Sequence, residues 1–386
     1  MASTELVVFG DSISDTGNTY NWTSGYIPSP GSYWRGRFSN GPVWLDHLMR
    51  MAPSGGGAAA ENRLRILNYA FGGSTACPTA GTAIASLDMQ ITAFLAGVPP
   101  AGHAQSISSA ATASSISINS SSVTSAADLC AVSAGTGLAS SNGTAKKLPS
   151  VRFSAGPGGA EPVEPKGRLF VVLIGGNDLL FLRNWKDPRV IERRVANTSA
   201  CTVAALDRLM AALSSAQPQR LTPFAGRSEQ PEAAAEVGSS HDRIVVWNLG
   251  AVNRAPVVPP ALKATVADAV AAYNRNLEAA LAPLRSRYPD GPRLDVYDVH
   301  SASECVFRNA ERLGFKDATD PCLTDSPYLR AITSMADHSF ADAAQDRAAS
   351  RCTHPNEYMW FDDVHPTSRM HMLGLAAPFA RAQGWL

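Results

Sequence analysis

The stretch Val7-Val8-Phe9-Gly10-Asp11-Ser12-Ile13-Ser14 lies close to the start of the chain. Its apolar, β-branched beginning predicts a buried strand, and Gly10 predicts that the strand ends in a sharp turn. Asp11 and Ser12 are helix-capping residue types, so we expect Ser12 between a strand and a helix. Such a turn lies at the carboxyl edge of a parallel sheet, where open α/β folds bind their ligands. Ser12 is therefore a helix cap or a candidate nucleophile, and this stretch alone favours the cap.

Four further apolar runs have the composition of buried strands. They lie at residues 65–70, 168–174, 243–249 and 293–299. Helical patterns separate them, at about 42–51, 87–95, 188–216, 260–288 and 301–312, with a final helix after Thr367. Strands that alternate with helices predict an α/β fold with a parallel sheet covered on both faces.

Residues 98–166 differ in character from the rest of the chain. Ser, Ala, Thr, Gly and Pro dominate this segment, which has few large apolar side chains. Such a composition cannot bury enough surface to fold independently. We interpret the chain as a single domain, residues 1–386, with an insertion at about 98–166 that acts as a lid or as a mobile excursion tethered through Cys130.

Charge and hydropathy exclude several classes of protein. Lys and Arg together number 33, as do Asp and Glu, and no basic block is present. No apolar run approaches the roughly 20 residues of a transmembrane helix. We therefore expect no nucleic-acid partner and no stable membrane insertion. We also expect a monomer.

Cysteines and glycosylation sequons indicate a secreted protein. The start of the chain lacks signal-peptide features, which fits a cytosolic protein or a mature secreted one. An even number of cysteines, 6, without C-x-x-C spacing favours disulfides, although buried free thiols are the alternative. Sequons occur at Asn21, Asn119, Asn142 and Asn197. We expect Cys305 and Cys322 to pair because they flank one short loop, and the other four cysteines allow three connectivities.

Polar residues follow the predicted ends of three strands and recur near the C-terminus. After Ser12 come Phe71-Gly72-Gly73-Ser74 and Gly175-Gly176-Asn177-Asp178, and then Asp362-Asp363-Val364-His365. Because parallel strands end at one edge of a sheet, we expect the three strand ends to converge there.

These groups suit acyl transfer. A serine hydroxyl needs a neighbouring base, and histidine is the natural one near neutral pH. Asp362 precedes His365 by three residues, so a single turn lets its carboxylate orient the imidazole. The backbone N–H groups of Ser12 and Gly73 and the side-chain amide of Asn177 could stabilise an oxyanion.

The four segments resemble the four blocks of the GDSL or SGNH hydrolase superfamily, in the same order. The resemblance implies a flavodoxin-like three-layer α/β/α sandwich with strand order 2-1-3-4-5. It also implies Ser12 as nucleophile, His365 as base and Asp362 as its orienting group, with Ser12, Gly73 and Asn177 in the oxyanion hole. Ile13 replaces the leucine of the family motif, at a packing position. No metal or organic cofactor is expected.

A narrower resemblance concerns residues 34–44 (WRGRFSNGPVW) and 67–73 (LNYAFGG). They look like the fungal carbohydrate esterase family 16 acetylesterases, although plant and bacterial GDSL lipases share parts of both. The leading hypothesis is a secreted serine esterase that removes acetyl or other short acyl groups from carbohydrates. The alternatives are a lipase or lysophospholipase for longer acyl chains, an acyltransferase, and a sugar-binding protein without activity.

Substrate contacts are expected in the aromatic segment that follows Ser12, residues 20–44. Its aromatic side chains could hold a sugar or an acyl chain, or they could anchor the loop. Trp22 and Trp34 are the candidates for exposure, and Asp11 and His354 are further candidates for contact with a small-molecule or carbohydrate ester.

Overall fold

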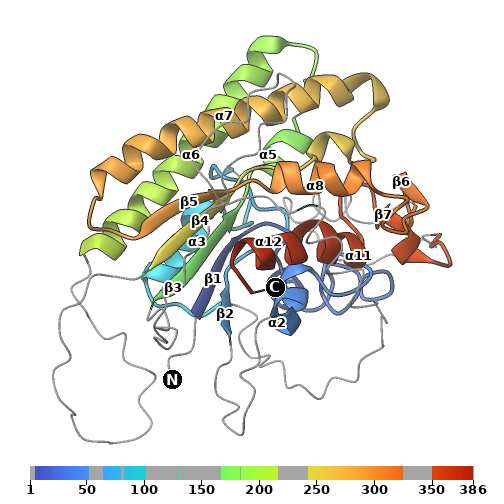
Figure 1. Cartoon of the computed structure of the whole chain (residues 1–386), viewed down its shortest axis with the longest axis horizontal. Coiled ribbons are helices and arrows are strands. Elements are labelled where there is room, and N and C mark those ends of the chain that lie inside the picture. The colour runs from blue at the N-terminus through green and yellow to red at the C-terminus, as the bar shows by residue number, and fades with distance from the viewer. Residues whose placement is uncertain are drawn as a thin grey trace, which may run out of the picture.

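The computed structural model describes residues 5–51, 64–79, 82–100, 130, 167–182, 184–215, 242–324 and 350–385. Five parallel strands form its main sheet, in the order β2-β1-β3-β4-β5 (Figure 1). They are β1 (Glu5–Gly10), β2 (Arg65–Asn68), β3 (Arg168–Leu173), β4 (Arg243–Trp247) and β5 (Arg293–Tyr297). All five predicted strands, and the strand order that the resemblance implied, are confirmed.

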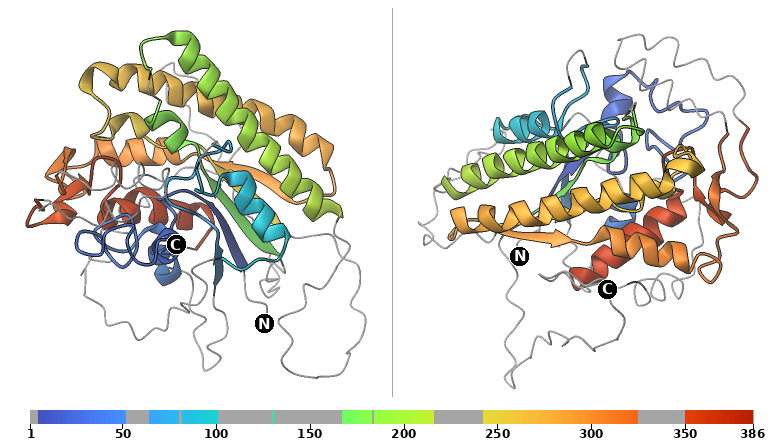
Figure 2. Two further views of the ribbon diagram at one scale, coloured as in Figure 1. Left: turned by 180° about the vertical axis from the view of Figure 1, so that it is seen from behind. Right: turned by 90° about the horizontal axis from the view of Figure 1, so that it is seen from above.

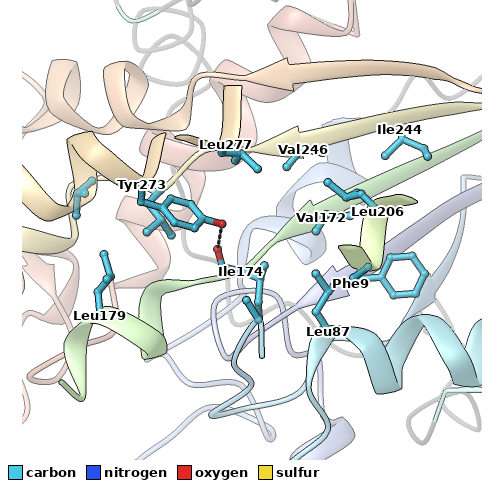
Figure 3. Packing of buried hydrophobic residues seen from close by; sticks show 14 of the residues in the cluster. Phe9, Leu87, Val172, Ile174, Leu179, Leu206, Ile244, Val246, Tyr273 and Leu277 are labelled. Atoms are coloured by element: carbon cyan, nitrogen blue, oxygen red, sulfur yellow. Dashed lines mark hydrogen bonds between the residues drawn. The ribbon is translucent and has the colours of Figure 1, made fainter. Parts of the chain in front are cut away.

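Alternate residues of each strand face opposite sides of the sheet, as the pleat requires. On one side, Phe9, Val172 and Val246 pack with α3 (Leu87–Leu95), α6 (Pro188–Ser215) and α7 (Lys263–Arg287). Figure 3 shows this packing, in which the Tyr273 hydroxyl donates a hydrogen bond to the Ile174 carbonyl.

The other side of the sheet has its own core. Val8, Val171 and Trp247 pack there with α2 (Trp44–Met51) and α12 (Ala377–Ala382). The two groups of helices lie on opposite sides of the strands (Figure 2). The predicted three layers, helices, sheet and helices, are therefore present.

Several helices depart from their predicted bounds. The predicted helix at 260–288 begins as the 3-10 turn Pro260–Leu262 before α7. The next helix, α8 (Val299–Arg308), starts earlier than predicted because the Asp298 side chain accepts the Ser301 N–H at 3.0 Å and caps it. The final helix is divided into α11 (Ser368–Met370), the π-helical turn His371–Ala376 and α12.

The remaining elements are short. They are α1 (Asn18–Trp22), α5 (Gly176–Leu180), the 3-10 turns Val252–Arg254 and Pro355–Glu357, and a small parallel pair of strands, β6 (Asp317–Pro321) and β7 (Tyr358–Trp360).

The cysteines form the bridges Cys77–Cys201, Cys130–Cys305 and Cys322–Cys352. The predicted Cys305–Cys322 bridge is wrong. The Cys352 N–H donates to the Cys322 carbonyl at 2.9 Å, and this backbone pairing brings together two cysteines that are 30 residues apart. Cys130 is tethered as expected, to α8 through Cys305, while the rest of residues 101–166 lies outside the described part of the chain.

Candidate active site

Ser12 lies in a tight turn directly after β1. The Asp11 carbonyl accepts the N–H groups of Ser14 and Asp15, both at 3.0 Å. The buried Gln90 side chain holds the strand end from α3, because it accepts the Gly10 N–H at 2.9 Å and donates to the Gly10 carbonyl at 2.8 Å. These contacts fix the backbone that carries the Ser12 hydroxyl. Nothing in the local sequence signalled Gln90.

Asp362 and His365 are joined by the turn that their spacing predicts. Asp362 Oδ1 accepts the backbone N–H groups of Val364 at 2.8 Å and of His365 at 2.6 Å. An antiparallel bridge between Trp360 and Pro366 closes the turn from outside. The carboxylate therefore organises the same turn that presents the imidazole to it.

The three predicted catalytic side chains form one hydrogen-bonded series. Ser12 Oγ lies 2.8 Å from His365 Nε2, and His365 Nδ1 lies 2.8 Å from Asp362 Oδ2. The residues are nearly inaccessible, with exposed fractions of 3% for Ser12 and 0% for the other two. Burial by itself raises the pKa of the Asp362 carboxyl, but His365 and several hydrogen bonds outweigh it and hold that pKa below its usual value.

Two aromatic residues from the loop before α2 support this series. The Tyr33 hydroxyl donates to Asp362 Oδ2 at 2.5 Å, and the Phe38 ring stacks on the His365 ring with centroids 5.2 Å apart. Both residues belong to the aromatic segment 20–44, whose side chains are predicted either to contact substrate or to anchor the loop. Here they anchor the loop on the candidate site, a contact that joins residues 329 positions apart.

The predicted oxyanion donors lie on neighbouring strand ends. The Asn177 amide donates one hydrogen bond to the Ser74 carbonyl at 2.8 Å, which leaves its second N–H for another acceptor. Gly73 has φ of 79°, a conformation that favours glycine. Within the described residues, the backbone N–H groups of Ser12 and Gly73 donate to no protein acceptor. Three donors therefore remain on this edge of the sheet.

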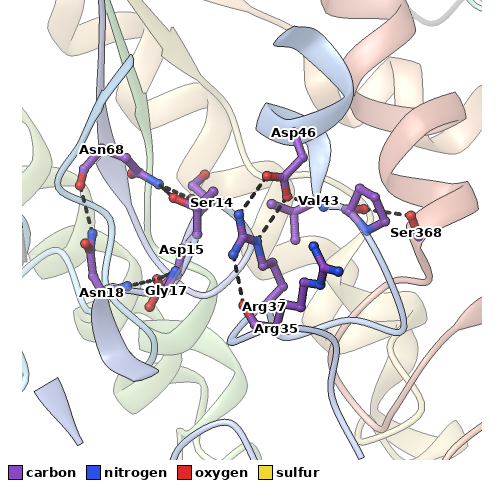
Figure 4. Close-up of polar contacts among 12 residues, drawn as sticks. Ser14, Asp15, Gly17, Asn18, Arg35, Arg37, Val43, Asp46, Asn68 and Ser368 are labelled. Carbon is purple, nitrogen blue, oxygen red and sulfur yellow. Dashed lines mark hydrogen bonds and ion pairs between the residues drawn. The ribbon is translucent and has the colours of Figure 1, made fainter. Parts of the chain in front are cut away.

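A polar network fixes the loops around the site (Figure 4). The Asn68 amide donates to the Ser14 carbonyl at 2.7 Å, and Asp15 accepts the Gly17 N–H at 2.7 Å. The Arg37 guanidinium makes a buried ion pair with Asp46 at 2.8 Å. These contacts tie the segment after β1 to β2 and to α2.

An apolar cavity of about 120 Å³ opens beside Ser12. Ser12 and Asn177 line one part of it, and most other lining side chains are apolar. They include Leu180, Leu249, Val252, Val299, Phe307 and Val364. Bonds between the loop after β4 and α8 hold one wall, since Arg254 pairs with Glu304 through two contacts of 2.7 Å. This cavity is suited to an apolar group attached near the serine.

The predicted substrate-contact residues fall into two groups. Asp11 lines the cavity, and burial raises the pKa of its carboxyl to about 7. Trp22, Trp34 and His354 are not among the lining residues. Trp22 packs edge-on against Phe71, Trp34 lies under the guanidinium groups of two arginines, each 5.3 Å from its ring centroid, and His354 is exposed. Their substrate roles stay predictions.

A parallel sheet with a hydroxyl, an imidazole and a carboxylate hydrogen-bonded in series at its carboxyl edge is typical of α/β serine hydrolases. The family model described as GDSL-like Lipase/Acylhydrolase matches residues 6–373. The chain therefore belongs to this family, as the resemblance of its four blocks predicted.

Curated relatives match the chain over shorter segments. It is 42% identical over 101 residues to a phosphatidylcholine-sterol acyltransferase of Aeromonas hydrophila, which covers 24% of this chain and 28% of that protein. It is 40% identical over 70 residues to the thermolabile hemolysin of Vibrio parahaemolyticus, or 18% and 14% of the two chains. It is 35% identical over 97 residues to the secreted effector protein SseJ of Salmonella typhimurium, or 24% and 22%. The similarity thus spans less than a third of each relative.

Proposed function

We propose that this protein is a secreted serine esterase that hydrolyses carboxylic esters through an acyl-enzyme. The observation that carries the proposal is the hydrogen-bonded series Ser12–His365–Asp362, whose serine lines the apolar cavity. Membership of the GDSL-like family supports ester hydrolysis or acyl transfer. The three disulfides support an oxidising compartment. Within the described residues no helix is long and apolar enough to cross a membrane.

The proposed reaction uses only side chains and backbone of this chain. His365 Nε2 removes the Ser12 hydroxyl proton while Ser12 Oγ attacks the ester carbonyl carbon. The N–H groups of Ser12, Gly73 and Asn177 donate to the resulting oxyanion. His365 then protonates the departing alcohol, and water cleaves the acyl-enzyme by the same route. Asp362 keeps the imidazole in the tautomer that this needs.

The lining of the cavity favours an acyl chain longer than acetyl. An acetyl group would leave most of the apolar walls uncovered. Each further methylene that is buried against them stabilises the bound transition state by about 0.8 kcal/mol, which raises kcat/KM about fourfold. Removal of acetyl groups from carbohydrates, the leading hypothesis from the sequence, stays a prediction. Trp22 and Trp34, which were predicted to contact a sugar or an acyl chain, do not line the cavity.

A chain-length series tests this proposal. We expect kcat/KM on p-nitrophenyl esters to rise from acetate toward longer acyl chains until the cavity is filled. Ser12→Ala should lower hydrolysis of every ester by about 10³-fold or more, with an unchanged circular dichroism spectrum. Activity that survives Ser12→Ala would rule out Ser12 as nucleophile. A maximum at acetate, together with release of acetate from acetylated oligosaccharides, would favour the carbohydrate substrate.

Val252→Phe probes the cavity directly. Val252 lines it and is half-buried, so a larger side chain there should shorten the cavity without unfolding the protein. We expect long-chain esters to lose activity while the acetate ester keeps it. Val98→Phe is the matched control, since Val98 is exposed and does not line the cavity.

Acyl transfer to an alcohol is the second candidate function. It is favoured by the apolar lining of the cavity beside Ser12, which suits an apolar alcohol better than water, and by the similarity to the Aeromonas acyltransferase. Addition of glycerol or a sterol to the assay would yield a new ester if transfer competes with hydrolysis.

A further inference from the structure

We propose that Tyr33 is a positioning residue of this site: its hydroxyl holds the Asp362 carboxylate in the orientation that engages His365. The proposal rests on the proposed function. It assigns a catalytic consequence to a residue of the aromatic loop that none of the four family-like blocks contains.

The contact is short and buried. The Tyr33 hydroxyl donates to Asp362 Oδ2 at 2.5 Å, and the exposed fractions of the two residues are 4% and 0%. The same oxygen lies 2.8 Å from His365 Nδ1, the shorter of its two contacts with the carboxylate. Oδ1 lies 3.0 Å from Nδ1 and also accepts two backbone N–H groups of the turn. Tyr33, from the loop before α2, thus holds Oδ2, while the turn itself holds Oδ1. A hydrogen bond to a carboxylate is among the stronger ones.

The Tyr33 ring is itself fixed. It packs edge-on against Phe361, with centroids 5.4 Å apart, and against Phe38, at 6.3 Å. Phe361 directly precedes Asp362, and Phe38 stacks on His365. The Tyr33 N–H also donates to the Ser29 carbonyl at 2.9 Å. The hydroxyl therefore reaches the carboxylate from a rigid position, which geometric control requires.

The hydroxyl also affects the charge of the site. Donation to Oδ2 is one of the contributions that lower the pKa of Asp362 against the effect of burial, after the charge and the side-chain hydrogen bond of His365. Among the described residues, the other titratable or charged groups near the pair include His365 and the adjacent carboxylate of Asp363. Asp11 and His371 interact electrostatically with His365, and the Arg351 guanidinium lies 5.6 Å from the Phe361 ring centroid. Removal of the Tyr33 hydroxyl would leave all of them in place and make the carboxylate more basic.

Tyr33→Phe tests the proposal because it removes the hydroxyl and keeps the ring. A more basic Asp362 holds the protonated form of His365 more strongly. We therefore expect the acidic limb of the kcat/KM profile to move to higher pH by about 0.5 unit or more. We also expect kcat to fall about tenfold with little change in KM, because Tyr33 is buried and does not line the cavity beside Ser12.

Tyr358→Phe is the matched control. Tyr358 packs against the cluster of Tyr33, Cys322, Leu323 and Phe361, and it is not among the groups that affect the Asp362 carboxyl. It should leave the pH profile unchanged. If both variants lose the same activity without a shift of the acidic limb, Tyr33 is merely a packing residue and the proposal is wrong. Hydrolysis by the wild type and its loss in Ser12→Ala establish the proposed function separately.

A second variant applies if Tyr33→Phe does not fold. Replacement of Tyr33 by 3-fluorotyrosine keeps the hydroxyl and makes it a stronger donor. The acidic limb should then move to lower pH, opposite to the direction expected for phenylalanine. An unmoved limb in this variant would overturn the proposal, because a structural role depends on the shape of the ring and not on the acidity of its hydroxyl.

Discussion

Asp11, the residue before Ser12, has a carboxyl group whose charged form is disfavoured by burial. Its carboxyl is 5% exposed, it interacts electrostatically with Asp178, and its pKa is raised to about 7, chiefly by desolvation. The Ile13 N–H, which donates to the carboxyl at 3.1 Å, and the nearby His365 favour its charged form, but they do not offset the desolvation. A strongly perturbed carboxyl that lines a cavity is typical of functional sites.

We predict that Asp11→Asn stabilises the protein above pH 7. The folded state binds the Asp11 proton more tightly than the unfolded state does, so the stability that this group contributes is present below about pH 4 and is lost as the pH rises through about 7. Asparagine removes that loss and can still accept the Ile13 N–H. Urea unfolding at pH 8 should show a gain of up to roughly 4 kcal/mol, which disappears near pH 4.

A stabilised variant with reduced ester hydrolysis would indicate that Asp11 is kept for function. Equal stability of the wild type and Asp11→Asn at pH 8 would contradict the raised pKa.

Gly10 shows how closely the central strands approach at the edge that carries the site. Its register partner on β3 is Leu173, and a Cβ at position 10 would lie 2.6 Å from the Leu173 carbonyl oxygen. Real Cβ atoms do not approach a backbone oxygen so closely, and neither strand can yield without disturbing the turn that carries Ser12.

We predict that Gly10→Ala lowers the free energy of unfolding by about 1–3 kcal/mol, because it overpacks the sheet. We also expect it to lower kcat at least tenfold by displacing Ser12. Gly176→Ala is the stability control at the next strand end, since its Cβ would meet only Asp11 Oδ2 at 3.6 Å, an ordinary contact. Thermal unfolding of both variants measures the difference in stability between them. Similar losses of stability in the two would refute the explanation by close approach of the strands.

The N-terminal and C-terminal parts of the chain meet behind the site, on the face covered by α2 and α12. His47 Nε2 lies 3.1 Å from the Ser368 carbonyl oxygen, and the Trp44 N–H points to His371 Nδ1 at 3.3 Å. Both histidines are buried. Desolvation lowers the pKa of His47 to about 4 and that of His371 well below its usual value.

Acid should therefore weaken this junction. The unfolded state binds the His47 proton more tightly, so the stability associated with neutral His47 is present above about pH 6.5 and is lost as the pH falls toward 4. We predict that the difference in unfolding free energy between the wild type and His47→Gln falls by roughly 3 kcal/mol from pH 7 to pH 4. The exposed His354→Gln is the control. A difference that is independent of pH would show that His47 is not buried in its neutral form.

The strands, the turn that carries Ser12 and the Asp362–His365 turn could be predicted from the sequence, because each depends on neighbouring residues. The order of the strands came only from the resemblance to the family, since it depends on pairings between distant segments. Apolar runs end at glycines, and an aspartate three residues before a histidine can cap the turn that presents it. Because the strands are parallel, their carboxyl ends lie at the same edge of the sheet. The same reasoning predicted where Asn177 and Gly73 lie, while their role in an oxyanion hole remains to be tested.

Long-range contacts could not be predicted in this way. Nothing around Tyr33 indicates that it meets Asp362, 329 positions away, or that Gln90 holds Gly10, 80 positions away. The Cys305–Cys322 prediction failed for the same reason, since nearness along the chain is a poor guide to pairing when backbone contacts bring Cys352 to Cys322. The apolar cavity has the same origin: its walls come from loops of several strands, and only their packing in three dimensions gives a volume that can select an acyl chain.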